Sequence, residues 1–125
     1  MTRTLLLIDD DDDIREIAQL SLELGAGWTI FAAASGEEGV ARAREKKPDA
    51  ILLDVMMPVL DGPATLARLR EDERTRDIPV LFLTAKARPA ERDRLAGLSV
   101  AGVLAKPFDP VRLPEQISAL LGWRA

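Results

Sequence analysis

The sequence predicts an α/β fold, in which a parallel five-stranded sheet is covered by helices on both faces. Two patterns predict it. Five short apolar segments alternate along the chain with five segments that carry helical spacing or helix caps. The third apolar segment, residues 50–53, is apolar throughout, which is typical of a parallel strand buried on both faces. Strands and helices that alternate in this way are joined by right-handed crossovers.

Length and composition favour a single domain. The chain has 125 residues, of which 47% are hydrophobic and 30% charged, so it is large enough for a core and is unlike a disordered or a membrane protein. No apolar run approaches the roughly 18 residues of a membrane span, and no signal peptide precedes the first apolar segment. We therefore expect one domain over residues 1–125 and a cytoplasmic location. The abrupt ends of the chain favour a stand-alone protein.

The residue types that are missing exclude several kinds of chemistry. The chain has no cysteine, which excludes disulfides, thiolate zinc sites and a cysteine nucleophile. It has no histidine, which excludes histidine metal sites, a Ser-His triad and a phosphohistidine on this chain. A net charge of −4 does not favour contact with a phosphate backbone, so we expect no direct binding of nucleic acid.

The first apolar segment leads into an acidic run and a helix. Residues 4–8, Thr-Leu-Leu-Leu-Ile, are expected to form a buried strand and are followed by five consecutive aspartates, Asp9 to Asp13. The helix that follows is expected to have Asp12 as its N-cap and to end at Gly25 and Gly27. The residues at helical spacing in this helix are Ile14, Ile17, Ala18, Ser21 and Leu24 or Gly25.

A second strand and a second helix are expected before the central strand. The strand covers residues 28–33, and the helix begins near Ser35, where Ser-Gly-Glu-Glu matches a capping box. Pro48 breaks this helix after Lys46. The third strand then runs to Asp54.

The second half of the chain continues the alternation. Pro58 disfavours helix at Met57 and marks a loop, which is followed by a helix over residues 62–73. A fourth strand, residues 80–83, ends at Thr84. The remaining expected elements are a helix over residues 89–97, a strand over residues 101–105, and a helix to Leu121 with Asp109 as cap, Pro110 at the first helical position and an apolar stripe of Leu113, Ile117, Leu120 and Leu121.

Polar residues follow four of the five predicted strands. Asp9 and Asp10 follow the first strand, Asp54 the third, Thr84 the fourth and Lys106 the fifth. Because the carboxyl ends of parallel strands share one edge of a sheet, these side chains should converge where open α/β sheets bind ligands. Three carboxylates repel one another, so at least one pKa should rise unless a cation compensates.

The residue types at this edge suit a hard metal ion and phosphoryl chemistry. Oxygen ligands without His or Cys favour Mg²⁺ before Ca²⁺, and the aspartate run lacks the glycine and the terminal glutamate of an EF-hand loop. A carboxylate can also be a nucleophile that forms an aspartyl phosphate. Lys106 and the Thr84 hydroxyl would supply the donors that phosphoryl transfer needs.

Several of these residues have simpler interpretations. Taken alone, Asp54 could be the cap of the following helix. We interpret Asp11, Asp12 and Asp13 as solvated carboxylates in the first helical turn, where the helix dipole favours them. We interpret Lys86, two residues after Thr84, as a solvated lysine rather than a residue that controls the access of water or of a partner.

The motifs at the strand ends occur in a definite order, and together they make the chain resemble a known family. They are the acidic pair Asp9-Asp10, Asp54 followed by Met57-Pro58 and Asp61-Gly62, Thr84-Ala85, and Lys106-Pro107-Phe108. Over nearly its whole length the chain resembles a receiver domain of two-component response regulators. The resemblance implies a flavodoxin-like (βα)5 fold with strand order 2-1-3-4-5.

The resemblance implies a phosphoacceptor and a set of Mg²⁺ ligands. Asp54 resembles the family's phosphoacceptor, and Asp10 resembles the carboxylate that binds Mg²⁺ directly. Asp54 and the backbone carbonyl of Met56 would complete the protein's share of the ligands. Asp9 resembles the ligand that is reached mainly through water.

The resemblance also implies how the phosphoryl group is read. Lys106 resembles the clamp on that group, Thr84 the hydroxyl that moves onto it, and the Lys106–Pro107 bond is cis in the family. At Val103 the chain departs from the family, which usually has Tyr or Phe there as a switch that turns inward on phosphorylation. The usual aromatic readout is therefore not expected.

A receiver implies partners rather than a metabolic substrate. The expected partners are a histidine kinase or histidine phosphotransfer protein, and an output partner on the face of the fourth helix, fifth strand and fifth helix. The protein would be a monomer or a weak phosphorylation-dependent dimer, and would catalyse only its own phosphorylation and dephosphorylation.

Two alternatives remain. A haloacid-dehalogenase-type phosphatase would need a second aspartate where the chain has Met56. An interaction module of the same fold without phosphorylation would be favoured by loss of an acidic residue of the site, and none is lost.

Overall fold

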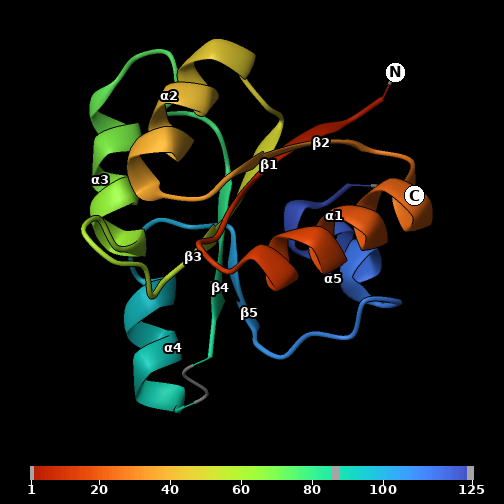
Figure 1. Cartoon of the computed structure of the whole chain (residues 1–125). Helices are drawn as coiled ribbons and strands as arrows, with labels where there is room; N and C mark the ends of the chain where they lie inside the picture. The colour runs from red at the N-terminus through yellow and green to blue at the C-terminus, as the bar shows by residue number, and fades with distance from the viewer. Residues whose placement is uncertain (1, 86–87, 124–125) are drawn as a thin grey trace.

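The computed structural model describes residues 2–85 and 88–123, and it confirms the predicted architecture (Figure 1). Within these residues one parallel sheet has the strand order β2-β1-β3-β4-β5 and is accompanied by five helices. The strands are β1 (Thr4–Ile8), β2 (Thr29–Ala33), β3 (Ala50–Asp54), β4 (Val80–Thr84) and β5 (Gly102–Ala105). The helices are α1 (Asp12–Ala26), α2 (Gly36–Lys46), α3 (Gly62–Glu71), α4 (Pro89–Ala96) and α5 (Leu113–Leu121).

The sheet separates two apolar layers because side chains alternate between its faces. Leu5 and Leu7 of β1 face the layer formed with α1 and α5, whereas Leu6 and Ile8 face the layer formed with α2, α3 and α4. Figure 1 shows α1 and α5 together on one side of the sheet and the other three helices on the opposite side. Strands β3 and β4 are buried along their whole length, as the apolar run of residues 50–53 predicted for β3.

The first helix begins one residue earlier than predicted. Its N-cap is Asp11 rather than Asp12, because the Asp11 carboxylate accepts hydrogen bonds from the backbone N–H groups of Asp13 and Ile14 at 2.9 and 3.2 Å. The expected end is confirmed, since Gly27 caps the helix with φ 70°. Asp12 and Asp13 then lie in the first turn, where the helix dipole favours negative charge.

The predicted apolar face of α1 is partly wrong. Ala18 is buried as expected, but the second buried position is Leu22, which the sequence pattern did not select. Leu24 is 83% exposed and Ile17 is 44% exposed. The helix packs against both β1 and α5, and this packing, rather than the apolar spacing alone, decides which stripe is covered.

The capping box at α2 is present in a modified form. The Ser35 hydroxyl accepts from the Glu38 backbone N–H at 3.1 Å. The returning hydrogen bond to the Glu38 carboxylate comes from the backbone N–H of Ala34 at 2.6 Å, one residue before the cap. Both ends of the box therefore fix the entry of the chain into α2.

Two further helix boundaries differ from the prediction by two residues or more. Helix α3 ends at Glu71, because Asp72 has extended backbone angles. Helix α5 begins at Leu113 rather than after Asp109, because the Asp109 carboxylate accepts from the Val111 backbone N–H at 2.9 Å and closes a separate turn.

Within the described parts of the chain, no helix combines the length and the apolar character needed to cross a membrane.

Candidate functional site

The strand ends bring the predicted residues to one edge of the sheet. Asp9 follows β1, and β1 pairs directly with β3, which ends at Asp54. Strand β4 lies on the other side of β3 and ends at Thr84, which pairs with Ala105, the residue before Lys106. The sheet register therefore places these four residues side by side, as the sequence predicted.

Three carboxylates form one cluster at this edge. Asp9, Asp10 and Asp54 each offer an oxygen, and these three atoms lie within 4.8 Å of one another. The side chains of Asp9 and Asp54 are buried, at 0% and 4% exposure, and Asp10 is exposed. Two charges are thus removed from water while the third remains accessible from solvent.

The two oxygens of the buried Asp9 carboxylate have different partners. Its Oδ1 accepts from the Asp11 backbone N–H at 2.9 Å. Its Oδ2 is buried and accepts no well-aligned hydrogen bond within the described residues, although the Lys106 ammonium forms an ion pair with it at 2.8 Å. A buried oxygen without a full set of donors suits a carboxylate that binds a cation.

Lys106 links two of the three carboxylates. Its Nζ lies 2.8 Å from Asp9 Oδ2 and 3.1 Å from Asp54 Oδ1. Burial alone would lower the pKa of Lys106, but its close contacts with Asp9 and Asp54 and their negative charges outweigh burial, so the pKa is raised. The lysine therefore stays charged and partly neutralises the cluster.

The ionised form of the Asp54 carboxyl group is disfavoured in the folded chain. Burial is the largest cause that raises its pKa, and the nearby charge of Asp9 raises it further, to about 6. The hydrogen bond and charge of Lys106 and a backbone hydrogen bond from Met56 act in the opposite direction but do not cancel these effects. This result agrees with the expectation that at least one carboxyl pKa in the cluster should rise.

The loop after Asp54 is fixed by close backbone contact. The Gly62 N–H donates to the Val55 carbonyl at 2.9 Å, and a Cβ at Gly62 would lie only 2.7 Å from both the Asp54 carbonyl oxygen and Val55 Cα. Only glycine fits this approach without a shift of the backbone. Asp61 caps α3 by accepting from the Ala64 N–H at 2.9 Å, so it is Asp61, and not Asp54, that caps the following helix.

The other predicted residues lie around this cluster. Thr84 is buried at the end of β4, and its backbone carbonyl accepts from the Lys106 N–H at 2.8 Å. The Lys106–Pro107 peptide is cis, as the resemblance implied. Met56 has a 59% exposed residue surface and a backbone hydrogen bond to Asp54. Lys86 lies outside the described residues.

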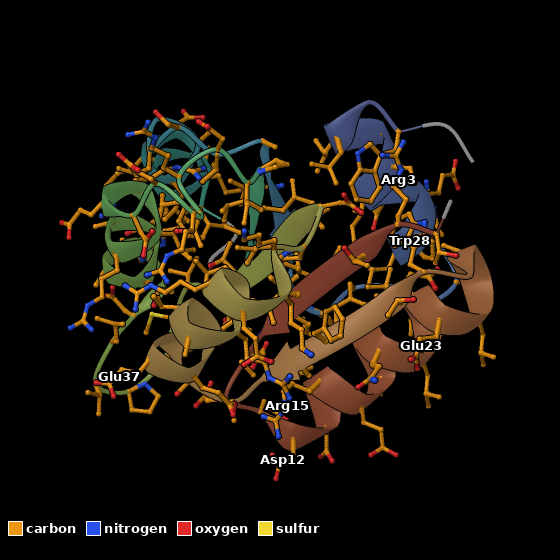
Figure 2. The ribbon with its side chains drawn as sticks, turned by 90° about the horizontal axis from the view of Figure 1, so that it is seen from above. Arg3, Asp12, Arg15, Glu23, Trp28 and Glu37 are labelled. Carbon is orange, nitrogen blue, oxygen red and sulfur yellow. The ribbon has the colours of Figure 1, made fainter. Side chains whose placement is uncertain are left out.

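One residue beside the site was missed by sequence reasoning. Arg15 of α1 donates from Nη1 to the Asp9 backbone carbonyl at 2.8 Å, and its Nη2 pairs with the Asp12 carboxylate. Figure 2 shows Arg15 and Asp12 together at the start of α1. The spacing of three residues between Asp12 and Arg15 predicts the ion pair, but no sequence pattern indicates the contact with the Asp9 carbonyl.

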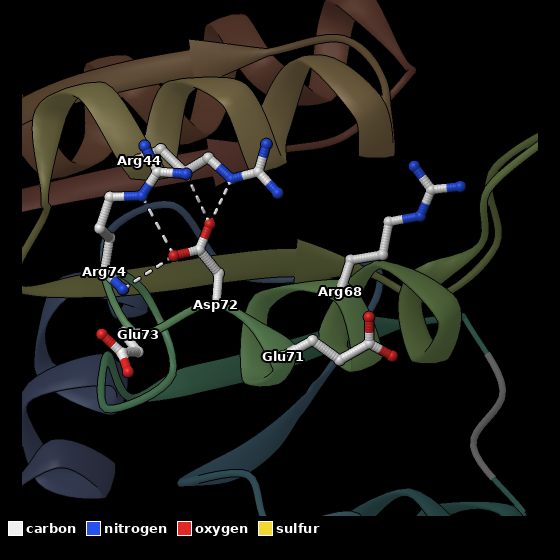
Figure 3. A pocket seen from close by; sticks show the side chains of 6 residues that line it. All are labelled: Arg44, Arg68, Glu71, Asp72, Glu73 and Arg74. Atoms are coloured by element: carbon white, nitrogen blue, oxygen red, sulfur yellow. Dashed lines mark hydrogen bonds and ion pairs between the residues drawn. The ribbon is translucent and has the colours of Figure 1, made fainter.

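A second cluster of charges lies away from the strand ends, between α2 and the segment after α3 (Figure 3). The Asp72 carboxylate pairs with Arg44 at 2.7 Å and with Arg74 at 2.8 Å. Hydrogen bonds from the Arg74 side chain and backbone hold the pKa of Asp72 well below its usual range. Figure 3 shows the Arg68 side chain extending away from Asp72. These charges join α2 to the segment after α3 and share no residue with the acidic cluster.

Comparisons with known proteins agree with the geometry. The family described as "Response regulator receiver domain" matches residues 5–118. The DNA-binding dual master transcriptional regulator RpaA of Synechocystis is 40% identical over 117 residues, which cover 94% of this chain and 48% of that protein. The phosphate regulon transcriptional regulatory protein PhoB of Pseudomonas aeruginosa is 38% identical over 121 residues, which cover 95% and 52%. The chain thus spans about half the length of these relatives.

Solved structures show the same fold. The Vibrio cholerae chemotaxis response regulator CheY4 is 29% identical with a TM-score of 0.88, over 96% of this chain and 99% of that one. The receiver domain of sensor histidine kinase PA1611 from Pseudomonas aeruginosa is also 29% identical, with a TM-score of 0.85 over 98% and 99%. That structure has a magnesium ion coordinated in its active site cleft.

Proposed function

Because this chain belongs to the receiver domain family of two-component response regulators, we propose that it accepts a phosphoryl group on Asp54. The observation that carries the proposal is the position of Asp54, which is buried at the end of β3. It shares a cluster with Asp9 and Asp10 and lies 3.1 Å from the Lys106 ammonium. The donor is a phosphohistidine of a partner protein, since this chain has no histidine.

The acidic cluster suits Mg²⁺. Asp9, Asp10 and Asp54 offer three carboxylate oxygens within 4.8 Å of one another, and Asp9 has a buried Oδ2 without a well-aligned hydrogen bond within the described residues, so the cluster forms a donor set for a hard cation. We assign Asp10 and Asp54 as direct ligands, with the Met56 backbone carbonyl, and Asp9 as a ligand through water. When bound, Mg²⁺ would neutralise the charge that gathers on the acceptor and phosphoryl oxygens.

The transfer itself is carried by the side chains of the chain. A carboxylate oxygen of Asp54 attacks phosphorus and forms the new P–O bond, while the P–N bond breaks and its electron pair leaves with the imidazole of the partner. The contact of Lys106 with Asp54 supports a role in which Lys106 pairs with a phosphoryl oxygen. The Thr84 hydroxyl, at the end of the adjacent strand, donates to another phosphoryl oxygen.

The response is proposed to reach a partner through α4, β5 and α5. Val103 of β5 is half-buried and packs against the apolar layer of α2, α3 and α4, and its carbonyl accepts from Arg92 of α4 at 3.3 Å. Valine cannot exchange an exposed ring for a buried one, so we infer that backbone shifts near Thr84 carry the change. DNA binding, which the name of one relative records, would require a part of a longer protein outside this acidic domain.

Intact-mass measurement tests the proposal. Incubation of the protein with Mg²⁺ and a small phosphodonor such as phosphoramidate should add one phosphoryl group that is stable in acid and labile in base. Chelation of the metal should prevent the addition. Asp54→Asn keeps the shape of the side chain but removes the nucleophile, so it should abolish the addition without unfolding the protein.

Asp13→Asn is the matched control, because Asp13 belongs to the same aspartate run but lies exposed in the first turn of α1. This variant should be phosphorylated like the wild type. Full phosphorylation of Asp54→Asn, or of the wild type after chelation, would overturn the mechanism. Steady hydrolysis of a phosphate ester without a stable phosphorylated protein would instead favour a phosphatase.

A further inference from the structure

We propose that Arg15 is a positioning residue that holds the acidic turn between β1 and α1 in the conformation that binds the metal ion. The proposal rests on the function proposed above for Asp9, Asp10 and Asp54. In this proposal Arg15 does not contact the phosphoryl group. Arg15 acts on the backbone that carries Asp9 and Asp10, two of the three carboxylates.

The contacts of Arg15 span the whole turn. Nη1 donates to the carbonyl of Asp9 at 2.8 Å, at the end of β1, and Nη2 pairs with the carboxylate of Asp12, the first residue of α1. The Arg15 side chain is only 20% exposed, whereas its partner Asp12 is 87% exposed. One planar guanidinium thus bridges the residue that follows β1 and the first residue of α1, which suits the fixed fork of arginine.

The carbonyl that Arg15 binds belongs to the peptide bond between Asp9 and Asp10. Asp9 has other supports, because its carboxylate accepts from the Asp11 N–H and pairs with Lys106. The Asp10 carboxylate has no hydrogen bond or ion pair within residues 2–85 and 88–123, and it is exposed. The direction of Asp10 therefore depends on the backbone, and Arg15 holds the peptide plane that precedes it.

The charge of Arg15 and its geometry predict opposite effects on metal binding. If only charge mattered, removal of a cation beside three carboxylates would strengthen the binding of Mg²⁺. If positioning matters, its removal frees the turn and weakens binding, as is usual when a group that orients a metal ligand is lost. The ion pair with Asp12 already balances the arginine charge locally, which favours the second effect.

The experiment compares Arg15→Met, which removes the charge and the bridge, with Arg15→Lys, which keeps the charge but cannot span both partners. The dissociation constant of Mg²⁺ is measured on the unphosphorylated 125-residue chain by calorimetry and by the Mg²⁺-dependent rise of the melting temperature. Both variants should bind Mg²⁺ about 10-fold more weakly. Their phosphorylation rate should return to the wild-type value when Mg²⁺ is raised to saturation.

Arg68→Met is the matched control, because it removes the same charge from an exposed position of α3 and should leave the Mg²⁺ dissociation constant unchanged. Asp12→Asn releases the other end of the bridge and should weaken binding by a smaller factor, which provides a second test if Arg15→Met does not fold.

Three results would overturn the proposal. They are tighter Mg²⁺ binding by Arg15→Met with unchanged binding by Arg15→Lys, an unchanged dissociation constant in both variants, and a lower melting temperature without Mg²⁺ as the only effect. A wild-type protein that fails to bind Mg²⁺ would refute the proposed metal site itself. Wild-type binding together with equal binding by the Arg15 variants would refute the role of Arg15 alone.

Discussion

At the scale of single residues, Asp54 shows how a fold can hold a carboxyl group in an unfavourable charge state. The carboxyl group is buried beside Asp9, and its pKa is raised to about 6 even though Lys106 contacts it. The folded chain is therefore strained when Asp54 is ionised. Binding of a cation beside Asp9 and Asp54 would relieve that strain.

This strain predicts how the stability of the metal-free protein depends on pH. The pKa of Asp54 is about 6 in the folded chain and about 3.9 in an unfolded chain. Between these values the folded state holds a proton that the unfolded state has lost. The resulting stability is fully present below about pH 4 and is lost as the pH rises through 6.

Asp54→Asn removes the cost of ionising this buried carboxyl group and should be more stable than the wild type at pH 7, by roughly 1–3 kcal/mol. Urea unfolding of both proteins at pH 4.5 and pH 7, with the metal chelated, measures the difference. The gap between the two proteins should widen as the pH rises. A constant gap would show that the pKa of Asp54 is not raised, and Asp13→Asn should follow the wild type.

At the scale of elements, helix α1 has two roles. Its first turn holds Arg15, which contacts the Asp9 carbonyl of the candidate site, and its middle packs against β1 and α5. Leu22 is fully buried, whereas Leu24, two residues later, is 83% exposed. The apolar content of this helix therefore exceeds what its packing within the chain requires.

The two leucines should respond very differently to truncation. Leu22→Ala leaves a cavity in the apolar layer and should lower the free energy of unfolding by about 2–5 kcal/mol. Leu24→Ala removes an exposed side chain and should change it by less than about 0.5 kcal/mol. Urea unfolding of the two variants checks the order. Equal losses would mean that the register of α1 against the sheet differs from the one described.

At the scale of the whole molecule, the carboxyl and amino ends of the parallel strands have different roles. The carboxyl edge gathers the aspartates and Lys106. At the amino edge, the residues that precede β1 and β2 meet the end of α5. The rings of Trp28 and Trp123 are in edge contact with centroids 5.2 Å apart, and the guanidinium of Arg3 lies 4.4 Å from the Trp123 centroid. Figure 2 shows Arg3 and Trp28 close together at this edge.

Trp123→Ala should therefore destabilise the fold without affecting the chemistry at the opposite edge. Loss of the aromatic pair and of the cation–π contact should cost about 1–3 kcal/mol. Arg3→Ala removes only the second contact and should cost less. Chemical unfolding gives the free energies, and Mg²⁺ titration of the folded variants gives the affinity. A weakened Mg²⁺ affinity in folded Trp123→Ala would contradict this separation of the two edges.

The sequence by itself determined the alternation of strands and helices, the strand ends and the main members of the candidate site. Residues 50–53 are apolar throughout and stop at Asp54, and each later strand stops at a polar residue. Such features are local, because burial on both faces and the end of a strand leave their mark on consecutive residues. Parallel strand order then brings distant aspartates and Lys106 to one edge.

Only the tertiary structure decided how those residues are held. The choice of Leu22 over Leu24 in α1 depends on how two neighbouring elements meet, and the spacing of apolar residues allows either. The bridge from Arg15 to the Asp9 carbonyl involves a backbone group, which has no counterpart in the sequence. The pairing of Lys106 with both Asp9 and Asp54 depends on distances between side chains of three strand ends. Contacts of this kind are set by packing in three dimensions, so a one-dimensional pattern cannot specify them.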